Sequence, residues 1–290
     1  MWESVTFLLR LGLYFALSGL VAASVSLLLS DTLNYRLNKP FSLSLKRYFK
    51  FSLLAYIFIS LGYFWIRVGA FAEEGLQGLF DPLMISILYD SGLGDALNTS
   101  LIASLLAALF YGASLFIKLT WLNFILCLVM LLSISLSFSF TGHMADFSLI
   151  KKSLLSLHIL IAFLWLGSLY PLLRWLQLEN ITLSQKLFER FGFYASFLVP
   201  LLLIAGLGLS YLITSFDLAL LMTPWGGVLL FKLILVVAIL ALAAWHKYRL
   251  VPQLLATNGK NKMGRSLVWE IVLGVGILAF SAVLSTLLSP

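Results

Sequence analysis

The segment LLSLHILIAFLWLGSLYPLL, residues 154–173, decides the fold of this chain. Twenty successive residues without Asp, Glu, Lys or Arg are enough to cross the hydrocarbon core of a bilayer as a helix. His158 and Trp165 stand seven residues apart and therefore share one face of that helix. Gly167 leaves room for a neighbouring helix to approach closely. A histidine in lipid is costly unless it has a role, so His158 is the first candidate for function.

The rest of the chain repeats this apolar character. Of its 290 residues, 61% are hydrophobic and only 11% are charged, which excludes an ordinary water-soluble domain. The predicted spans lie at 5–29, 51–71, 99–117, 119–140, 153–173, 191–213, 227–245 and 267–288. Because lipid requires closed backbone hydrogen bonding and no alternating strands occur, we predict an all-α membrane bundle of about eight helices. It forms one integral membrane domain, with spans 1 to 4 in residues 1–140 and spans 5 to 8 in residues 141–290.

The net charge of +7 reflects orientation in the membrane and not a nucleic-acid partner. Fourteen of the 19 basic residues fall in alternate connections between spans: Arg36, Lys39, Lys46, Arg47, Lys50, Lys118, Arg174, Lys186, Arg190, Lys247, Arg249, Lys260, Lys262 and Arg265. The positive-inside rule places these connections in the cytoplasm and both termini on the outer, periplasmic side. The outer connections hold most of the acidic residues, which would suit a cation that arrives from outside.

Three basic residues fall inside the apolar spans, namely Arg10, Arg67 and Lys232. On the predicted orientation, they and His158 all lie in the outer part of the bilayer. Long basic side chains near the end of a span can extend to the interface, and this is the simple interpretation of Arg10 and Arg67. Lys232 lies more than one helical turn beyond Trp225, which marks the interface, so a functional role is favoured more strongly there.

Glu270 begins the last span on the inner side, at the depth of His246, Lys247 and Arg249. We expect an ion pair at the interface to explain Glu270, and we expect His246 to be a solvated cation at a helix end. The single cysteine, Cys127, lies inside a span, which excludes a disulfide framework and a paired-cysteine metal motif. None of these residues by itself indicates catalysis.

A short outer connection, TGHMAD at 141–146, brings potential metal ligands together just before the span that carries His158. Imidazole and thioether groups suit copper, and Cu(I) in particular. His143, Met144 and His158 therefore form a predicted copper site, with Met222 as a further thioether at similar depth. The alternative for His143 and Met144 is a solvated loop that binds nothing.

Several points in the second half resemble the copper resistance protein D family (CopD/PcoD type) in order and spacing. They are Gly142-His143, His158 with WLG at 165–167, Arg190-Phe191, Trp225-Gly226 with LFK at 230–232, YRLVP at 248–252, and Glu270. The resemblance implies copper uptake or handling across the bacterial inner membrane, with a periplasmic copper-binding partner of the copper resistance protein C type. Family members often carry a histidine three residues after the arginine of the first span, where this chain has Leu13.

His158 and Lys232 also resemble a second group, the HemJ-type protoporphyrinogen oxidases. In that group a histidine and a lysine at comparable places are associated with haem, so the resemblance implies haem b bound near His158 and Lys232. This chain has twice the usual number of spans for that group, so it ranks second.

Three functions follow from these observations. The first is a copper transporter or copper-handling protein, in which Cu(I) is captured by His143, Met144 and His158 and passes along a path bounded by Trp165 and supported by Glu270. The second is a haem-binding membrane redox protein, and the third is a membrane scaffold for a periplasmic copper chaperone. A path lined by Arg10, Arg67 and Lys232 would repel Cu(I) unless these cations are paired. Since no catalytic triad or nucleotide-binding motif occurs, we do not expect an enzyme.

Overall fold

The computed structural model of this protein describes residues 2–32, 38–116, 120–140, 148–214 and 218–288. Almost all of these residues are helical. The predicted copper ligands His143 and Met144 lie outside the described residues, so their part of the predicted site has no structural test.

Each of the eight predicted spans coincides with one long helix. These helices are α1 (Trp2–Thr32), α2 (Lys39–Ala72), α4 (Gly92–Phe116), α5 (Thr120–Ser137), α6 (Leu149–Leu178), α7 (Ile181–Thr214), α9 (Pro224–Trp245) and α10 (Gly259–Thr286). Seven of them are long and apolar enough to cross a membrane, whereas the apolar part of α5, Trp121–Ser137, is shorter. The prediction of an all-α, multi-pass membrane bundle is confirmed.

The remaining elements are short. They are η1 (Gln77–Phe80), α3 (Pro82–Tyr89), α8 (Leu218–Leu221) and η3 (His246–Leu250), a π-helical segment that continues α9 directly. In η3 the amide of Val251 donates to the carbonyl of His246 at 2.9 Å, which is the wider hydrogen bonding of a π-helix.

Two helices begin about three turns before the predicted membrane spans that they contain. Helix α2 begins at Lys39 instead of residue 51, and α7 begins at Ile181 instead of residue 191. A hydropathy scan detects only the part of a helix that lies in lipid, whereas the helix continues where water or side chains satisfy its first amides. At α7, for example, the side chain of Asn180 accepts a hydrogen bond of 2.9 Å from the amide of Thr182.

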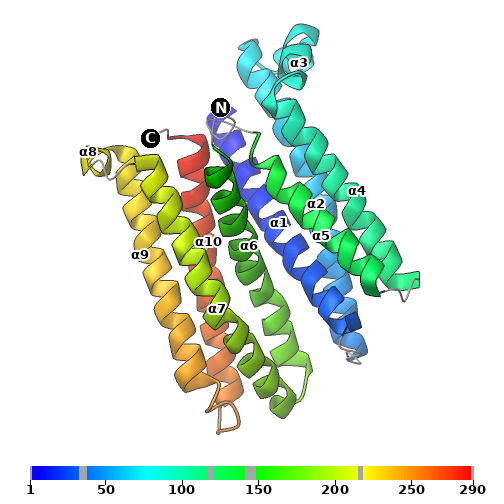
Figure 1. The fold of residues 1–290 in the computed structure, drawn as a ribbon, viewed down its shortest axis with the longest axis vertical. Helices are drawn as coiled ribbons and strands as arrows, with labels where there is room; N and C mark the ends of the chain where they lie inside the picture. The colour runs from blue at the N-terminus through cyan, green and yellow to red at the C-terminus, as the bar shows by residue number, and fades with distance from the viewer. Residues whose placement is uncertain (1, 33–37, 117–119, 141–147, 215–217, 289–290) are drawn as a thin grey trace.

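Helix α1 runs through the middle of the bundle (Figure 1). Helices α2, α4 and α5 lie on one side of it, and α6, α7, α9 and α10 lie on the other (Figure 1). Of the most apolar window of α1, 61% is buried, compared with 17% for α7 and 11% for α9. Helix α7 packs mainly on α6, and α9 packs mainly on α10. The outer helices α7 and α9 thus turn most of their apolar surface away from the protein.

The sequence predicted that a neighbouring helix approaches closely at Gly167, and in the structure that helix is α1. A Cβ atom placed there would overlap the backbone carbonyl of Ser18 and would come within 2.9 Å of the Cβ atom of Ala22. Gly167 is therefore the point at which the two sides of the bundle meet backbone to backbone.

Both ends of the described chain lie at one end of the bundle, together with α3 and α8 (Figure 1). We call this the terminal end. The connections from α6 to α7 and from α9 to α10 lie at the opposite end (Figure 1), which we call the basic end because Lys260 and Lys262 stand there. That the terminal end faces the periplasm remains a prediction of the positive-inside rule.

Candidate functional site

His158 lies on α6 and is half-buried against α7. Its Nδ1 atom is 3.2 Å from the carbonyl oxygen of Leu202. Because a carbonyl oxygen can only accept, this hydrogen bond requires the proton on Nδ1 and leaves a lone pair on Nε2. Metal-binding histidines commonly donate their second ring nitrogen to a carbonyl in this way, which fixes the ring. The imidazole of His158 is thus oriented by the same kind of hydrogen bond that orients metal-binding histidines.

Gly206, one turn after Leu202 on α7, makes room for the His158 ring. A Cβ atom at this position would lie 2.8 Å from Cε1 of His158 and 3.0 Å from its Nδ1. Any larger residue would displace the imidazole or separate α6 from α7. Sequence reasoning did not identify Gly206, since nothing along the chain shows that it faces His158.

Lys232 on α9 is close enough to His158 to interact with it electrostatically. The structure thus brings together the two residues that the resemblance to haem proteins pairs.

A second polar group lies nearer the basic end, where α6, α10 and the π-helical segment meet. His246 Nδ1 is 2.9 Å from Glu270 Oε2, and His246 Nε2 is 2.6 Å from the hydroxyl of Ser266. The indole of Trp165 donates to Glu270 Oε1 at 3.1 Å. The four residues Ser266, His246, Glu270 and Trp165 form a continuous chain of hydrogen bonds, which we call the Glu270 network.

The expectation that His246 is a solvated cation is wrong. His246 is only 7% exposed and Glu270 only 3% exposed. Glu270 does form a pair, and its partner is His246, but both side chains are buried within the protein. The wider π-helical turn begins at His246, and such segments often occur at functional sites. Ser266 and Glu270 stand four residues apart, which was the sequence signal for a shared face of α10.

Arg10 forms a third polar site, on the other side of α6. It is 9% exposed, so the interpretation that it extends to the interface is wrong. Its guanidinium carbon lies 5.2 to 5.7 Å from the centres of the Tyr14, Tyr63 and Phe138 rings. Its Nε atom donates to the hydroxyl of Tyr14 at 3.2 Å. Arg67, in contrast, is half-buried, with its guanidinium 4.9 Å from the Phe71 ring towards the terminal end, as expected for a side chain that reaches the interface.

The structure does not unite all of the predicted site residues. Arg10 and Arg67 belong to the α1 and α2 side of the bundle, whereas His158 and Lys232 belong to α6 and α9, so these cations do not surround one common path. Met222 is 91% exposed and has no described contact with His158. Within the described ranges, no group of three or more His, Cys, Asp or Glu side chains is arranged to hold a metal ion.

The fold defines the class of protein as a helical, multi-pass membrane protein. Comparison with known proteins narrows this class. The sequence profile of the family "Copper resistance protein D" matches residues 185–284, from α7 through most of α10. The matched segment contains Lys232, His246 and Glu270, whereas His158 and Trp165 on α6 precede it. The resemblance to this family is thus confirmed over that segment.

A curated relative supports the same conclusion. The chain is 30% identical over 139 residues to the inner membrane protein YebZ of Escherichia coli (strain K12). The aligned region covers 46% of this chain and 47% of the relative, so the chain matches about half of that protein's length. With the seven apolar helices, the relative confirms the predicted location as a multi-pass protein of the bacterial inner membrane. No solved structure matches the chain.

Proposed function

We propose that this protein handles copper at the bacterial inner membrane, with Cu(I) bound at His158 during its passage. The observation that carries the proposal is the hydrogen bond from His158 to the Leu202 carbonyl. It leaves Nε2 directed away from the backbone and available to a soft metal ion. The family match over α7 to α10 supports copper as the metal.

The nearby Lys232 makes this a weak site, which suits transfer better than storage. A transported ion must bind well enough to enter and weakly enough to leave. Uncharged imidazole and thioether groups bind Cu(I) without adding negative charge, so the ammonium group would favour release. We include His143 and Met144, which precede α6 in the chain, as the remaining ligands of the proposed site.

The proposed partner is a periplasmic copper-binding protein of the copper resistance C type. It would dock at the terminal end, where the connection from α2 to α4 and the first turn of α4 carry the acidic residues Glu73, Glu74, Asp81, Asp90 and Asp95. Catalysis is not part of the proposal.

Copper retention by the purified protein tests this function. The protein is purified in mild detergent, loaded with Cu(I) under reducing conditions, and its copper and iron per chain are measured by elemental analysis. We expect His158→Ala to lower copper affinity about tenfold or more, since it removes a metal ligand. Cys127→Ala is the matched control, because it removes the chain's single thiol from the interior and leaves His158 intact.

Two glycine substitutions on α7 separate ligand geometry from general disturbance. Gly206→Ala places a methyl group against the His158 ring, whereas a Cβ atom at Gly208 meets only Leu154 Cδ1 at 3.4 Å, an ordinary contact. We expect Gly206→Ala to lower copper affinity and Gly208→Ala to leave it unchanged. Equal copper binding by the parent, His158→Ala and Gly206→Ala would contradict the proposed site.

Haem binding is the second candidate, and the closeness of His158 and Lys232 favours it. Nε2 of His158 is free to act as an axial ligand, and Lys232 could neutralise a propionate group, so these donors fit haem b. Bound haem would supply one-electron chemistry. The haem proposal would replace the copper proposal if the parent contains stoichiometric iron and shows a haem absorption spectrum that is lost in His158→Ala. If the parent contains neither copper nor iron, the result would favour the third function, a membrane scaffold for a copper chaperone.

A further inference from the structure

Arg10 is a buried cation with almost no described hydrogen-bond partner. Of the five N–H groups of a guanidinium, Nε–H donates to the Tyr14 hydroxyl, and the described residues show no further hydrogen bond from Arg10. No carboxylate of the described residues lies within 4.0 Å of it. The three surrounding rings stabilise the charge through cation–π contacts. A buried guanidinium with so few partners among the described residues would be stabilised further by a bound anion.

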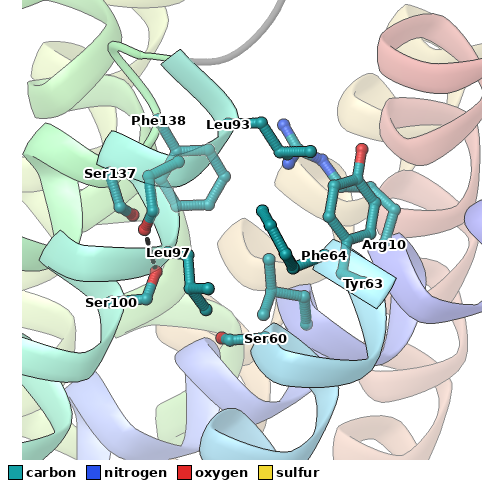
Figure 2. Close-up of a pocket in the computed structure, with 11 residues that line it drawn as sticks. Arg10, Ser60, Tyr63, Phe64, Leu93, Leu97, Ser100, Ser137 and Phe138 are labelled. Carbon is teal, nitrogen blue, oxygen red and sulfur yellow. Dashed lines mark hydrogen bonds between the residues drawn. The ribbon is translucent and has the colours of Figure 1, made fainter. Parts of the chain in front are cut away.

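The guanidinium lines a small pocket between α1, α2, α4 and α5 (Figure 2). Its volume is about 30 Å³, which is more than a single water molecule needs. Figure 2 shows Arg10 beside Tyr63 on one side of the pocket, with the Ser100 and Ser137 side chains across from them. Apolar side chains, among them Phe64, complete the wall.

A second, independent observation points to an acceptor ligand in the same pocket. The hydroxyl of Ser60, which also lines it, is buried without a hydrogen-bond partner. The other two serines differ, because Ser100 donates to the Ala96 carbonyl at 2.7 Å and Ser137 donates to the Ile134 carbonyl at 2.7 Å. Ser60 therefore offers an unused donor in the pocket that holds the unused donors of Arg10.

The pocket lies towards the terminal end of the bundle. Arg10 is about 12 Å along α1 from Trp2, from the rise of 1.5 Å per residue, and Leu93 and Ala96 belong to the first turns of α4. A ligand at this depth could come from the aqueous side or from the headgroup layer of the adjacent leaflet.

We propose that the Arg10 pocket binds a phosphate group, either free phosphate or the headgroup of a phospholipid. The planar guanidinium fork matches phosphate oxygens, and buried arginines are common at such sites. Arg10 contributes its free N–H groups and Ser60 its hydroxyl. The hydrogen bond from Tyr14 to Ser285 at 3.0 Å connects the occupied pocket to α10.

The test measures thermal unfolding of delipidated protein in a non-ionic detergent and a phosphate-free gluconate buffer. Sodium phosphate is titrated in one series and phosphatidylglycerol in another, with diacylglycerol as the lipid that lacks phosphate. We expect phosphate or phosphatidylglycerol, but not diacylglycerol, to raise the midpoint of the parent. Native mass spectrometry of the purified parent distinguishes the sources, since a retained phospholipid identifies the headgroup and its absence identifies the free anion.

Arg10→Met keeps the volume of the side chain and removes its charge, and we expect about 100-fold weaker binding. Arg67→Met is the matched control, a half-buried arginine of the same leaflet outside the pocket, and should bind as the parent does. If Arg10→Met does not fold, Ser60→Ala is tested in its place, and we expect it to bind phosphate or phosphatidylglycerol about tenfold more weakly than the parent. The proposal is overturned if the parent responds to neither ligand, or if the pocket variants respond as strongly as the parent.

Discussion

The Glu270 network and the Arg10 pocket each hold a buried ionisable side chain, but the two sites differ in how many partners the protein supplies for it. Both carboxylate oxygens of Glu270 and both ring nitrogens of His246 have partners within the protein. Arg10 has one hydrogen bond and three aromatic rings. Because a charge in a membrane interior is costly unless it has partners, the partners within the protein account for the first site, whereas the proposed phosphate would complete the second.

We expect the largest loss of stability from a substitution that disrupts the Glu270 network. Glu270→Ala leaves His246 and Trp165 without their shared acceptor, and we expect unfolding in mixed detergent micelles to become about 3–5 kcal/mol more favourable. Glu189→Ala removes an exposed carboxylate of α7 and should change this value little. A double variant, His246→Leu with Glu270→Met, should recover much of the loss, because an apolar pair needs no partners. A small effect of Glu270→Ala alone would mean that water replaces the carboxylate.

The contact between the two sides of the bundle comes next. Gly167→Ala forces a methyl group onto the Ser18 carbonyl of α1, and we expect a loss of about 3 kcal/mol in the same unfolding assay. Because α1 carries Arg10, a shift of α1 should also reduce the stabilisation by phosphate. Gly112→Ala is the control, since a Cβ atom there has no neighbour within 4 Å. Equal stability of both variants would show that α1 and α6 can separate without cost.

Trp165→Phe tests one hydrogen bond of the Glu270 network while keeping an aromatic ring. Hydrogen bonds to charged groups contribute about 1.5–3 kcal/mol, so we expect a loss within that range and smaller than that of Glu270→Ala. Trp269→Phe changes an indole that is mostly exposed and should be nearly neutral in the same assay. If the two tryptophan variants lose the same stability, the Trp165 indole is not a working donor to Glu270.

The smallest effect is expected at Arg10. In phosphate-free, delipidated protein, Arg10→Met replaces an unpaired buried cation with an apolar side chain, and stability should stay within about 1 kcal/mol of the parent. A bound anion should stabilise the parent but not Arg10→Met, so the difference in stability between these two proteins should increase with the phosphate concentration. A loss as large as that of Glu270→Ala in the anion-free state would show that Arg10 is already satisfied by the protein.

Sequence reasoning succeeded where one residue's own chemistry decides the outcome. Apolar length located each of the eight long helices, and the small size of Gly167 predicted the close approach of a neighbouring helix. It failed where a distant partner decides the outcome. His246 stands among basic residues in the chain, yet Glu270 and Ser266 of α10 enclose it. Arg10 could extend to the interface by its length alone, yet the rings of Tyr14 on α1, Tyr63 on α2 and Phe138 just after α5 enclose it.

The candidate copper site shows the same division. His158 was identified because a histidine in an apolar segment is unusual, which needs no structure to recognise. Its orientation depends on the Leu202 carbonyl and on the space left by Gly206, both on α7, and on the nearby Lys232 of α9. The roles of His143 and Met144 remain predictions.

The sequence by itself determined that this chain is a helical, multi-pass membrane protein, because lipid imposes its demands on each segment separately. Only the tertiary structure decided which polar groups are satisfied. Hydrogen bonds and charge pairs depend on distances of a few ångströms between residues that are far apart in the chain. These distances complete the Glu270 network and leave Arg10 with donors for a ligand.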